Sequence, residues 1–482
     1  MSPQFPRAHD FSLTLLVVVY FLYLVWPATH DYLNPDDTMN LYVAWTTPVA
    51  ALLKGTFAFW TGAIRPVGGL YYRLIYALGG FHPLPFRLTC FLLLILNLVL
   101  AFQFYRLLTA LRDAFLAAFI GCFHGAMWTI YSSTGTIYDI LCQTFVLTAV
   151  ILYVAGRRQG GISLLRVILI WLCTILAIGS KEMAYTLPLV FVCYELTFHP
   201  PEALGAIGPW VRQQFPAVGV TALFSVAAWL GRKAAKNGVD QLYGYKPLLT
   251  SENILHALRQ YLYLLSFKTM IFTSAQAVLL LTMALLLALL LRSHVMLFGW
   301  LYTTVFAIPL LIVPPRHSGY VLYVPSTGLA LYAAGAIRFG TIFLERVTLN
   351  LAWRSPWARA ARNIMLSLVL LATILLHLLQ RHLVVARDFA PGGEDQVRVL
   401  SEDVLRLYPR LPTNTRLLLI NDAFGDERWQ PMFVIHLTYG DRSLKITKMR
   451  QEERTGALRI RPGAYDHVLV YDGGHYREVL TN

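Results

Sequence analysis

The chain has 482 residues, of which 57% are hydrophobic and only 14% are charged. A soluble protein could not bury so much apolar surface, and many apolar runs are long enough to cross a hydrocarbon core of roughly 30 Å. The formal net charge of +14 would suit nucleic acid in a soluble protein. Here the basic residues lie in loops between apolar runs, where lipid headgroups are nearer partners. Composition therefore indicates a multi-pass integral membrane protein and excludes nucleic acid as its partner.

The apolar runs predict eleven membrane-spanning helices, because a lipid-exposed segment must satisfy its own backbone amides. The first run resembles a signal peptide in length, but Trp26-Pro27-Ala28 is a poor cleavage site. We therefore interpret it as a retained anchor. The predicted spans are 11–27, 86–105, 113–131, 137–155, 163–179, 184–198, 214–231, 275–292, 296–313, 319–338 and 363–383. The stretch 251–272 has one apolar helical face and a polar start, which is typical of a helix lying in the interface.

Arginine-rich turns set the expected orientation. The turns at 106–112 and 157–166 and the stretch 338–362 are basic, which predicts that they are cytoplasmic. The loop 28–85, the region 232–274 and the C-terminal tail then face outward. An anionic ligand would account for the basic residues that this topology also places outside, namely Arg65, Arg232, Lys233, Lys236, Lys246 and Arg316.

The pattern changes to that of a water-soluble module after about residue 387. An amphipathic helix that ends at Tyr408-Pro409 is expected from the spacing of Val397, Leu400, Val404 and Leu407. Short β-like runs follow at 416–420, 443–447 and 467–471. We expect an all-α polytopic membrane domain over 1–386, with a catalytic outer loop 28–85, and a small extracytoplasmic α/β domain over 387–482.

The most informative local feature is the acidic pair Asp36-Asp37, which follows the first span. The surrounding residues predict a turn that opens a helix over 39–51, with Asp37 or Thr38 as its N-cap. Capping needs only one carboxylate. The pair could instead supply a general base that takes a proton from an acceptor hydroxyl, or a ligand for a divalent cation. Capping alone stays open as the simpler interpretation.

Basic residues recur at the same predicted membrane face. Arg65 precedes the second span, Lys181-Glu182 separates two apolar helices, and Arg316-His317 follows a proline pair. A guanidinium or ammonium there suits a phosphate. The alternatives are that Arg65 reaches up to lipid headgroups and that Lys181 and Glu182 form a structural ion pair.

Asp139 opens the fourth span, where it either binds an acceptor or caps the helix. Tyr323 precedes a kink at Pro325-Ser326 that could open space for a substrate. The five cysteines lie within or beside apolar runs, so neither a disulfide framework nor a zinc site is expected. No cofactor is indicated with certainty, and a divalent cation stays open.

An ordered set of these pieces resembles the GT-C glycosyltransferases over roughly residues 10–340. The nearest likeness is to the O-mannosyltransferase-like membrane proteins that carry tetratricopeptide repeats. The set comprises Asp36-Asp37, Arg65-Pro66, Asn97, Asp139-Ile140-Leu141, Ser180-Lys181-Glu182 with Thr186-Leu187-Pro188, and Arg316 with Tyr323-Val324-Pro325-Ser326. The sequence departs from the family where Ile137-Tyr138 replaces Gly-Arg, where no His follows Asn97, and where the C-terminal domain lacks the repeat period.

The resemblance implies a sugar donor linked to polyprenyl phosphate, an inverting transfer on the extracytoplasmic face, and no nucleotide-sugar site. Asp36 and Asp37 would match the family's acidic pair, and Lys181 and Arg316 would match positions near the donor phosphate. The donor phosphate site expected overall comprises Arg65, Lys181, Arg316 and His317, with Asp139, Glu182 and Tyr323 in acceptor-binding or supporting roles. The acceptor is a glycan, a lipid or a protein.

Two other functions stay open. A lipid or solute transporter, such as a flippase, would also need a cationic cavity, although these charges gather at one boundary rather than at mid-membrane. A noncatalytic scaffold would use the C-terminal module to recruit partners. The sequence has no Asn-X-Ser/Thr sequon, which favours the plasma or inner membrane of a prokaryote over the endoplasmic reticulum.

Overall fold

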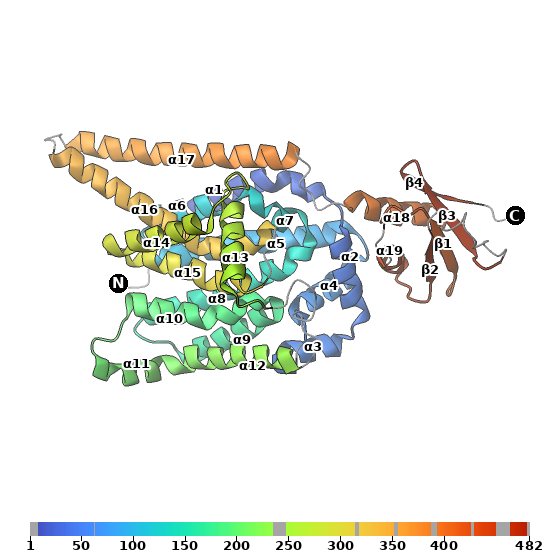
Figure 1. Ribbon diagram of the computed structural model, residues 1–482, viewed down its shortest axis with the longest axis horizontal. Coiled ribbons are helices and arrows are strands. Elements are labelled where there is room, and N and C mark those ends of the chain that lie inside the picture. The colour runs from blue at the N-terminus through green and yellow to red at the C-terminus, as the bar shows by residue number, and fades with distance from the viewer. Residues whose placement is uncertain are drawn as a thin grey trace.

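The computed structural model describes residues 8–61, 63–234, 247–313, 318–350, 355–386, 393–425, 429–449 and 463–479. These residues form a bundle of long helices and, from residue 393 onward, a smaller C-terminal unit that contains a sheet (Figure 1). The helices of the bundle are α1 (Ala8–Val25), α2 (Pro35–Thr46), α3 (Val49–Phe57), α4 (Pro66–Gly79), α5 (Pro83–Leu108), α6 (Leu111–Gly121), α7 (Trp128–Ser132), α8 (Ile137–Arg158), α9 (Leu164–Ser180), α10 (Leu187–Phe198), α11 (Ile207–Gln214), α12 (Val220–Ala234), α13 (Ser251–Leu265), α14 (Ser274–Leu290), α15 (His294–Leu311), α16 (Tyr323–Asn350) and α17 (Ser355–Ala386).

Helices occupy all eleven predicted spans in the described part of the chain, but 113–131 falls on two of them, α6 and α7, and 184–198 falls on α10, which has only 12 residues. Among the described residues, seven helical segments are long and apolar enough to cross a membrane, namely Asp10–His30, Pro83–Leu108, Thr134–Arg158, Ile207–Ala234, His294–Leu311, Gly319–Val347 and Arg359–Ala386. An eighth is the pair Leu111–Gly121 and Gly125–Ser132, bent by 57°. Two shorter apolar helices are Leu164–Ser180 and Ser274–Leu290. The polytopic membrane fold expected from composition is confirmed.

Close backbone approach holds parts of the bundle together. A Cβ added to Gly299 of α15 would lie 2.7 Å from the Gly328 carbonyl oxygen of α16, and one added to Gly328 would lie 2.5 Å from the Gly299 carbonyl oxygen. Small residues at such crossings are typical of membrane helices, where van der Waals packing replaces the hydrophobic drive. Many aliphatic side chains on α17 are exposed, including Leu368, Leu371 and Leu375, as expected of a lipid-facing surface.

The C-terminal unit consists of α18 (Glu394–Leu407), β1 (Arg416–Ile420), α19 (Gln430–Tyr439), β2 (Lys445–Met449), β3 (His467–Asp472) and β4 (His475–Glu478). The strand order is β2-β1-β3-β4, with β1 parallel to β2 and β3, and β4 antiparallel to β3. The predicted α18 and its end at Tyr408 are confirmed, as is β1, while β2 starts two residues later than predicted and β3 ends one residue later. Sequence patterning missed α19 and β4.

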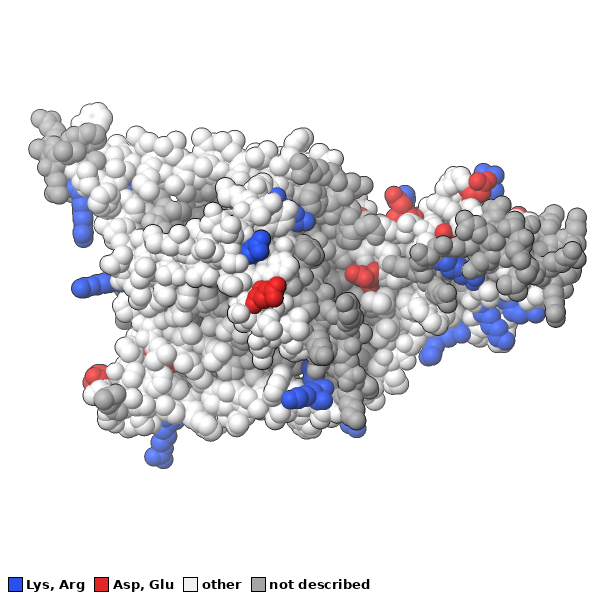
Figure 2. Space-filling view, viewed as in Figure 1, with Lys and Arg blue, Asp and Glu red and all other residues white. Residues whose placement is uncertain are grey.

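The loop after the first span and the C-terminal unit meet at one end of the bundle. Figure 1 shows α2 beside the C-terminal unit, with α3 and α4 at the same end of the bundle. Helix α13, the expected interfacial helix, runs across the axes of the spanning helices in this view. Charged side chains are sparse over the helical body and more frequent on the C-terminal unit (Figure 2). Helix α2, which follows the first span, and the C-terminal unit therefore lie at the same end of the helix bundle.

Candidate functional site

Helix α2 carries the acidic pair, and its first turn is fixed by a reciprocal capping box. The side chain of Asn34 accepts from the Asp37 amide at 3.0 Å, and Asp37 Oδ2 accepts from the Asn34 amide at 3.0 Å. Pro35 occupies the first helical position, where its missing N–H costs nothing. The prediction that Asp37 or Thr38 is the N-cap of a helix over 39–51 was therefore wrong, because Asn34 is the cap and Asp37 stands three residues inside.

Asp37 is fully engaged by the protein itself. Its Oδ1 accepts from Ser133 Oγ at 3.0 Å and from the amide of Gly135, both from the turn that precedes α8. The residue is 1% exposed. Burial raises the pKa of Asp37, while the nearby Arg87 and the hydrogen bonds from Asn34 and Ser133 offset part of that rise. Asp37 thus anchors α2 to the membrane-spanning helices.

Asp36 has the opposite environment. It is exposed, and within the described ranges no hydrogen bond or ion pair is made by its side chain. Its backbone carbonyl accepts from Asn40 Nδ2 at 2.8 Å. Of the two adjacent carboxylates, Asp37 is therefore buried and hydrogen-bonded, whereas Asp36 is accessible to a ligand.

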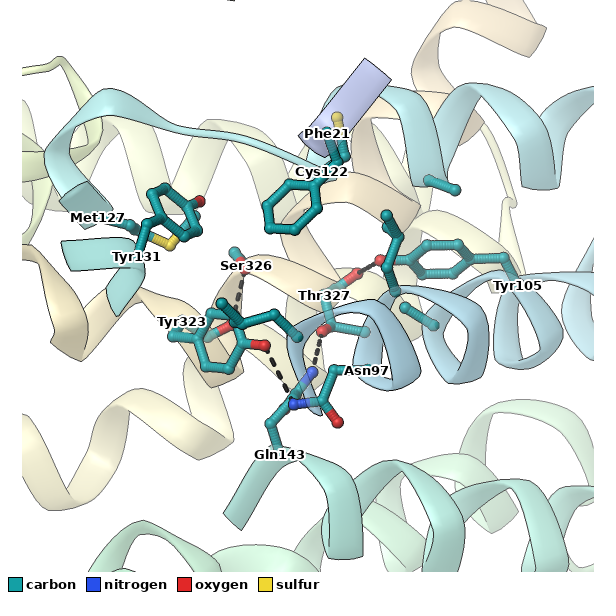
Figure 3. Close-up of a pocket in the computed structure, with 15 residues that line it drawn as sticks. Phe21, Asn97, Tyr105, Cys122, Met127, Tyr131, Gln143, Tyr323, Ser326 and Thr327 are labelled. Carbon is teal, nitrogen blue, oxygen red and sulfur yellow. Dashed lines mark hydrogen bonds between the residues drawn. The ribbon is translucent and has the colours of Figure 1, made fainter. Parts of the chain in front are cut away.

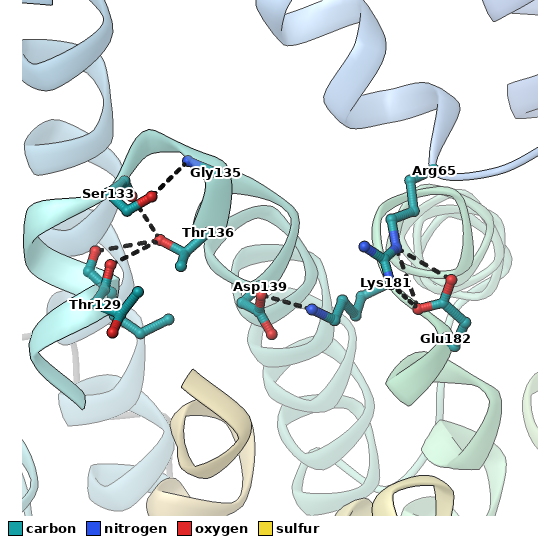
Figure 4. A network of polar contacts seen from close by, with 9 residues as sticks. Arg65, Thr129, Ser133, Gly135, Thr136, Asp139, Lys181 and Glu182 are labelled. Carbon is teal, nitrogen blue, oxygen red and sulfur yellow. Dashed lines mark hydrogen bonds and ion pairs between the residues drawn. The ribbon is translucent and has the colours of Figure 1, made fainter. Parts of the chain in front are cut away.

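A cluster of charges lies where α4, α8, α9 and α12 approach one another (Figure 4). Arg65 forms a two-pronged ion pair with Glu182, with Nε to Oε1 at 3.1 Å and Nη2 to Oε2 at 2.9 Å. Arg232, at the end of α12, donates to Glu182 Oε1 at 2.7 Å. Arg65 precedes α4 and has a φ of 47°, a left-handed backbone conformation that is strained for a residue with a side chain. The strained residue is the one whose guanidinium pairs with Glu182.

Lys181 and Asp139 form the second part of the cluster. Lys181 Nζ donates to Asp139 Oδ2 at 2.7 Å and lies 4.6 Å from the ring centre of Tyr320. Asp139 is 2% exposed, and its Oδ1 is buried without a hydrogen-bond partner in the part of the chain that the structure describes. A buried carboxylate oxygen without a donor is costly. It is therefore suited to accept a hydrogen bond from a ligand hydroxyl.

The cluster as a whole keeps a positive balance. Among the described residues of the cluster, Arg65, Lys181 and Arg232 supply three positive charges against the two negative charges of Asp139 and Glu182, which leaves one net positive charge. Burial raises the pKa of Glu182, but Arg65 and Arg232 more than reverse this and hold the pKa well below its usual range. Glu182 therefore stays ionised, and an added anion meets a net attractive field.

Tyr138 connects the cluster to α2. Its hydroxyl donates to Asn40 Oδ1 at 3.2 Å, and the Arg65 guanidinium lies 5.4 Å from its ring centre. Asn40 in turn donates to the carbonyl of Asp36. A continuous set of contacts thus runs from the backbone of Asp36 to the cations.

The structure brings together four of the predicted site residues, Arg65, Asp139, Lys181 and Glu182. Tyr323 belongs to a different polar group, in which its hydroxyl accepts from Asn97 Nδ2 at 3.1 Å (Figure 3). Arg316 and His317 lie outside the described residues.

Tyr323 and Asn97 help to line a cavity of about 40 Å³ inside the bundle. Gln143 donates there to Thr327 Oγ1 at 2.7 Å (Figure 3). Asn97 Oδ1 and Gln143 Oε1 are buried without partners within the described residues, and a polar cavity of this size has room for a few water molecules. The cavity lies among the spanning helices, and none of the charged residues of the cluster lines it.

Sequence reasoning missed three participants, Arg232, Tyr138 and Tyr320. Arg232 had been noted only as a basic residue on the outer face, and nothing local links it to Glu182, fifty positions away. Among the described residues, no group of three or more His, Cys, Asp or Glu side chains could hold a metal ion.

Comparisons with known proteins identify the fold. No family model and no curated protein matches the sequence. The structure is similar to ArnT from Cupriavidus metallidurans bound to undecaprenyl phosphate, with a TM-score of 0.53, 13% identity, and coverage of 96% of this chain and 93% of that one. ArnT from the same organism in the apo state gives a TM-score of 0.52 at 13% identity, covering 91% and 86%. The chain therefore has the GT-C fold of membrane glycosyltransferases.

Proposed function

We propose that this protein is a GT-C glycosyltransferase that takes a sugar from a polyprenyl-phosphate donor and transfers it to an acceptor hydroxyl. One observation carries the proposal: α2, the helix that bears the exposed Asp36, contacts through Asn40 and Tyr138 a cationic cluster whose described side chains carry one net positive charge. The GT-C fold supports it, as does the undecaprenyl phosphate bound by ArnT. The acceptor is a glycan, a lipid or a protein.

Asp36 is the general base in this proposal, and Asp37 is the group that fixes its helix. Asp36 accepts the proton of the acceptor hydroxyl while that oxygen attacks the anomeric carbon from the face opposite the phosphate. The bond between the anomeric carbon and the phosphate oxygen breaks, and the lipid phosphate leaves with the electron pair. The anomeric configuration is thereby inverted.

The cations of the cluster stabilise the charge that builds on the departing phosphate. Arg65, Lys181 and Arg232 are held in place by Glu182 and Asp139, so little reorganisation is needed as the bond breaks. Asp139 Oδ1, the unpartnered buried oxygen, accepts from a hydroxyl of the donor sugar or the acceptor. Arg316 and His317 are retained as further phosphate-binding candidates from the sequence.

The proposal places residues 28–85 and the C-terminal unit on the extracytoplasmic face of a prokaryotic plasma or inner membrane. It treats 1–386 as the catalytic membrane domain and 387–482 as a separate unit. The position of α2 and the C-terminal unit at one end of the bundle supports a shared side.

Transfer assayed in detergent, with a polyprenyl-phosphate sugar and a panel of acceptors, tests this function directly. Asp36→Asn should lower kcat by about 10² to 10⁴, the usual contribution of a positioned base. Glu252→Gln, which removes an exposed carboxylate from α13, serves as the matched control and should keep the wild-type rate. Activity without sealed compartments distinguishes an enzyme from a flippase. Full activity of Asp36→Asn would refute its role as base.

A further inference from the structure

The C-terminal unit contacts the helix that carries the acidic pair. Helix α19 lies along α2, where Thr38 Oγ1 donates to Gln430 Oε1 at 2.9 Å. One turn further along α2, the Tyr42 ring lies 4.6 Å from that of Phe433, centre to centre, and its hydroxyl lies 3.3 Å from His436 Nδ1. Thr38 and Tyr42 are four residues apart and so share one face of α2. This face is turned toward α19.

The polar contacts between these helices are buried and directional. Thr38 is 0% exposed and Gln430 7% exposed, so neither can exchange its partner for water without moving. His436 Nε2 lies 2.9 Å from the carbonyl oxygen of Leu444, which can only accept. Nε2 therefore carries the proton in the neutral ring, and Nδ1 accepts from the Tyr42 hydroxyl. The pairing fixes both the distance and the rotation of α2 against α19.

Further contacts tie the flanks of α2 to the same unit. Tyr76 of α4 donates to the carbonyl of Leu437 at 2.7 Å, and the hydroxyls of Tyr32 and Ser401 lie 3.0 Å apart. On its other side, α2 is held by Asp37 through the turn before α8. Asp36 is thus carried on a helix clamped between the membrane-spanning helices and the C-terminal unit.

We propose that the C-terminal unit is a brace that positions α2, with Gln430 and His436 as positioning residues for Asp36. This inference rests on the proposed function only for its effect on transfer, because the brace itself is a structural claim about α2. Displacements of about 1 Å in a reacting group can cost on the order of 10²-fold in rate. A loosened brace therefore lowers turnover while the donor site, held by other helices, keeps its affinity.

Two measurements on the full-length protein test the brace. The first is hydrogen–deuterium exchange of peptides covering 35–46, and the second is the separation of kcat from KM for the lipid donor. Thr38→Val removes the hydroxyl at nearly constant volume, and Thr38→Ser restores it. Gln430→Leu is a milder second variant, because the Thr38 hydroxyl can then donate to the Pro35 carbonyl oxygen, 2.8 Å away. Asp466→Asn is the control, since Asp466 is an exposed residue of the same unit that pairs with Arg416.

Thr38→Val should raise exchange in α2 by about 10-fold, consistent with loss of one buried hydrogen bond, and Gln430→Leu should raise it by a smaller factor. Each variant should lower kcat by a factor similar to its effect on exchange, with KM for the donor unchanged, and Thr38→Ser should restore both readouts. Unchanged exchange in α2, or equal changes in Asp466→Asn, would overturn the brace. If exchange rises as expected but the wild-type protein transfers no sugar, the brace stands and the proposed function fails.

Discussion

Replacing Asp37 by Asn perturbs the anchor of α2 without changing the side-chain volume. The carboxylate accepts three hydrogen bonds, from the Asn34 amide, Ser133 Oγ and the Gly135 amide. An amide group has one oxygen and one NH₂, so at least one of these donors would face another donor. A buried donor left without its acceptor costs about 1–3 kcal/mol, whereas the Asn34 cap, which accepts from the backbone amide of residue 37, is kept.

Removal of the charge returns part of that cost, because burial already disfavours the ionised form of Asp37 and raises its pKa. We expect a net loss of about 2 kcal/mol in the local stability of α2, which corresponds to roughly 30-fold faster amide exchange over the helix. Mass-spectrometric hydrogen exchange on the purified protein measures this directly. Asp36→Asn is the internal comparison and should change local stability by less than about 0.5 kcal/mol. The reasoning fails if both variants exchange alike.

Three other perturbations probe the cluster and the brace. Glu182→Gln leaves Arg65 and Arg232 without the carboxylate that pairs with both. We expect the free energy of unfolding to fall by about 2 kcal/mol, less than for a fully buried pair because the carboxylate is 24% exposed. An unchanged thermal melting curve would contradict this. Gly231→Ala places a Cβ against the Trp60 carbonyl, so it should lower the free energy of unfolding by about 1–3 kcal/mol. It should also raise the KM for the donor, because the adjacent Arg232 is displaced; an unchanged KM would argue against this. Burial lowers the pKa of His436 below its usual 6.5, while the hydrogen bond to the Leu444 carbonyl and the charge of Asp441 raise it and Arg442 lowers it further. The neutral ring therefore favours the state in which α19 contacts α2. The contact of α19 with α2 should be fully present above pH 6.5 and weaken as the pH falls. Hydrogen–deuterium exchange of α2, corrected for the pH dependence of intrinsic exchange rates, measures this. If a His436→Gln variant keeps the same pH trend, protonation of His436 is not its cause.

Much of the fold follows from hydropathy and end signals in the sequence. Apolar length predicts the spanning helices because lipid leaves the backbone few alternatives. The end of α18 is marked by Tyr408-Pro409, since proline cannot continue a helix. Helix α19 was missed because its apolar residues are not confined to one face, which suits a helix buried between α2 and the sheet. Strand β4, His475–Glu478, is short and polar, with only Tyr476 fully buried.

The candidate site was predictable in part. Arg65, Asp139, Lys181 and Glu182 stand out because charges at a membrane boundary are costly without a partner. Their actual pairing, Arg65 with Glu182 and Lys181 with Asp139, depends on helix packing that no local spacing encodes. The choice of Asn34 as the cap of α2 was equally hidden, because Asn34, Asp37 and Thr38 are all good capping residue types.

The most direct test of the central claim is a cryo-electron microscopy map of the full-length protein with undecaprenyl phosphate. The account predicts phosphate density in contact with at least two of Arg65, Lys181 and Arg232, on the side of the bundle that carries Asp36. Phosphate density at the opposite end of the bundle, or separated from all three cations, would contradict it.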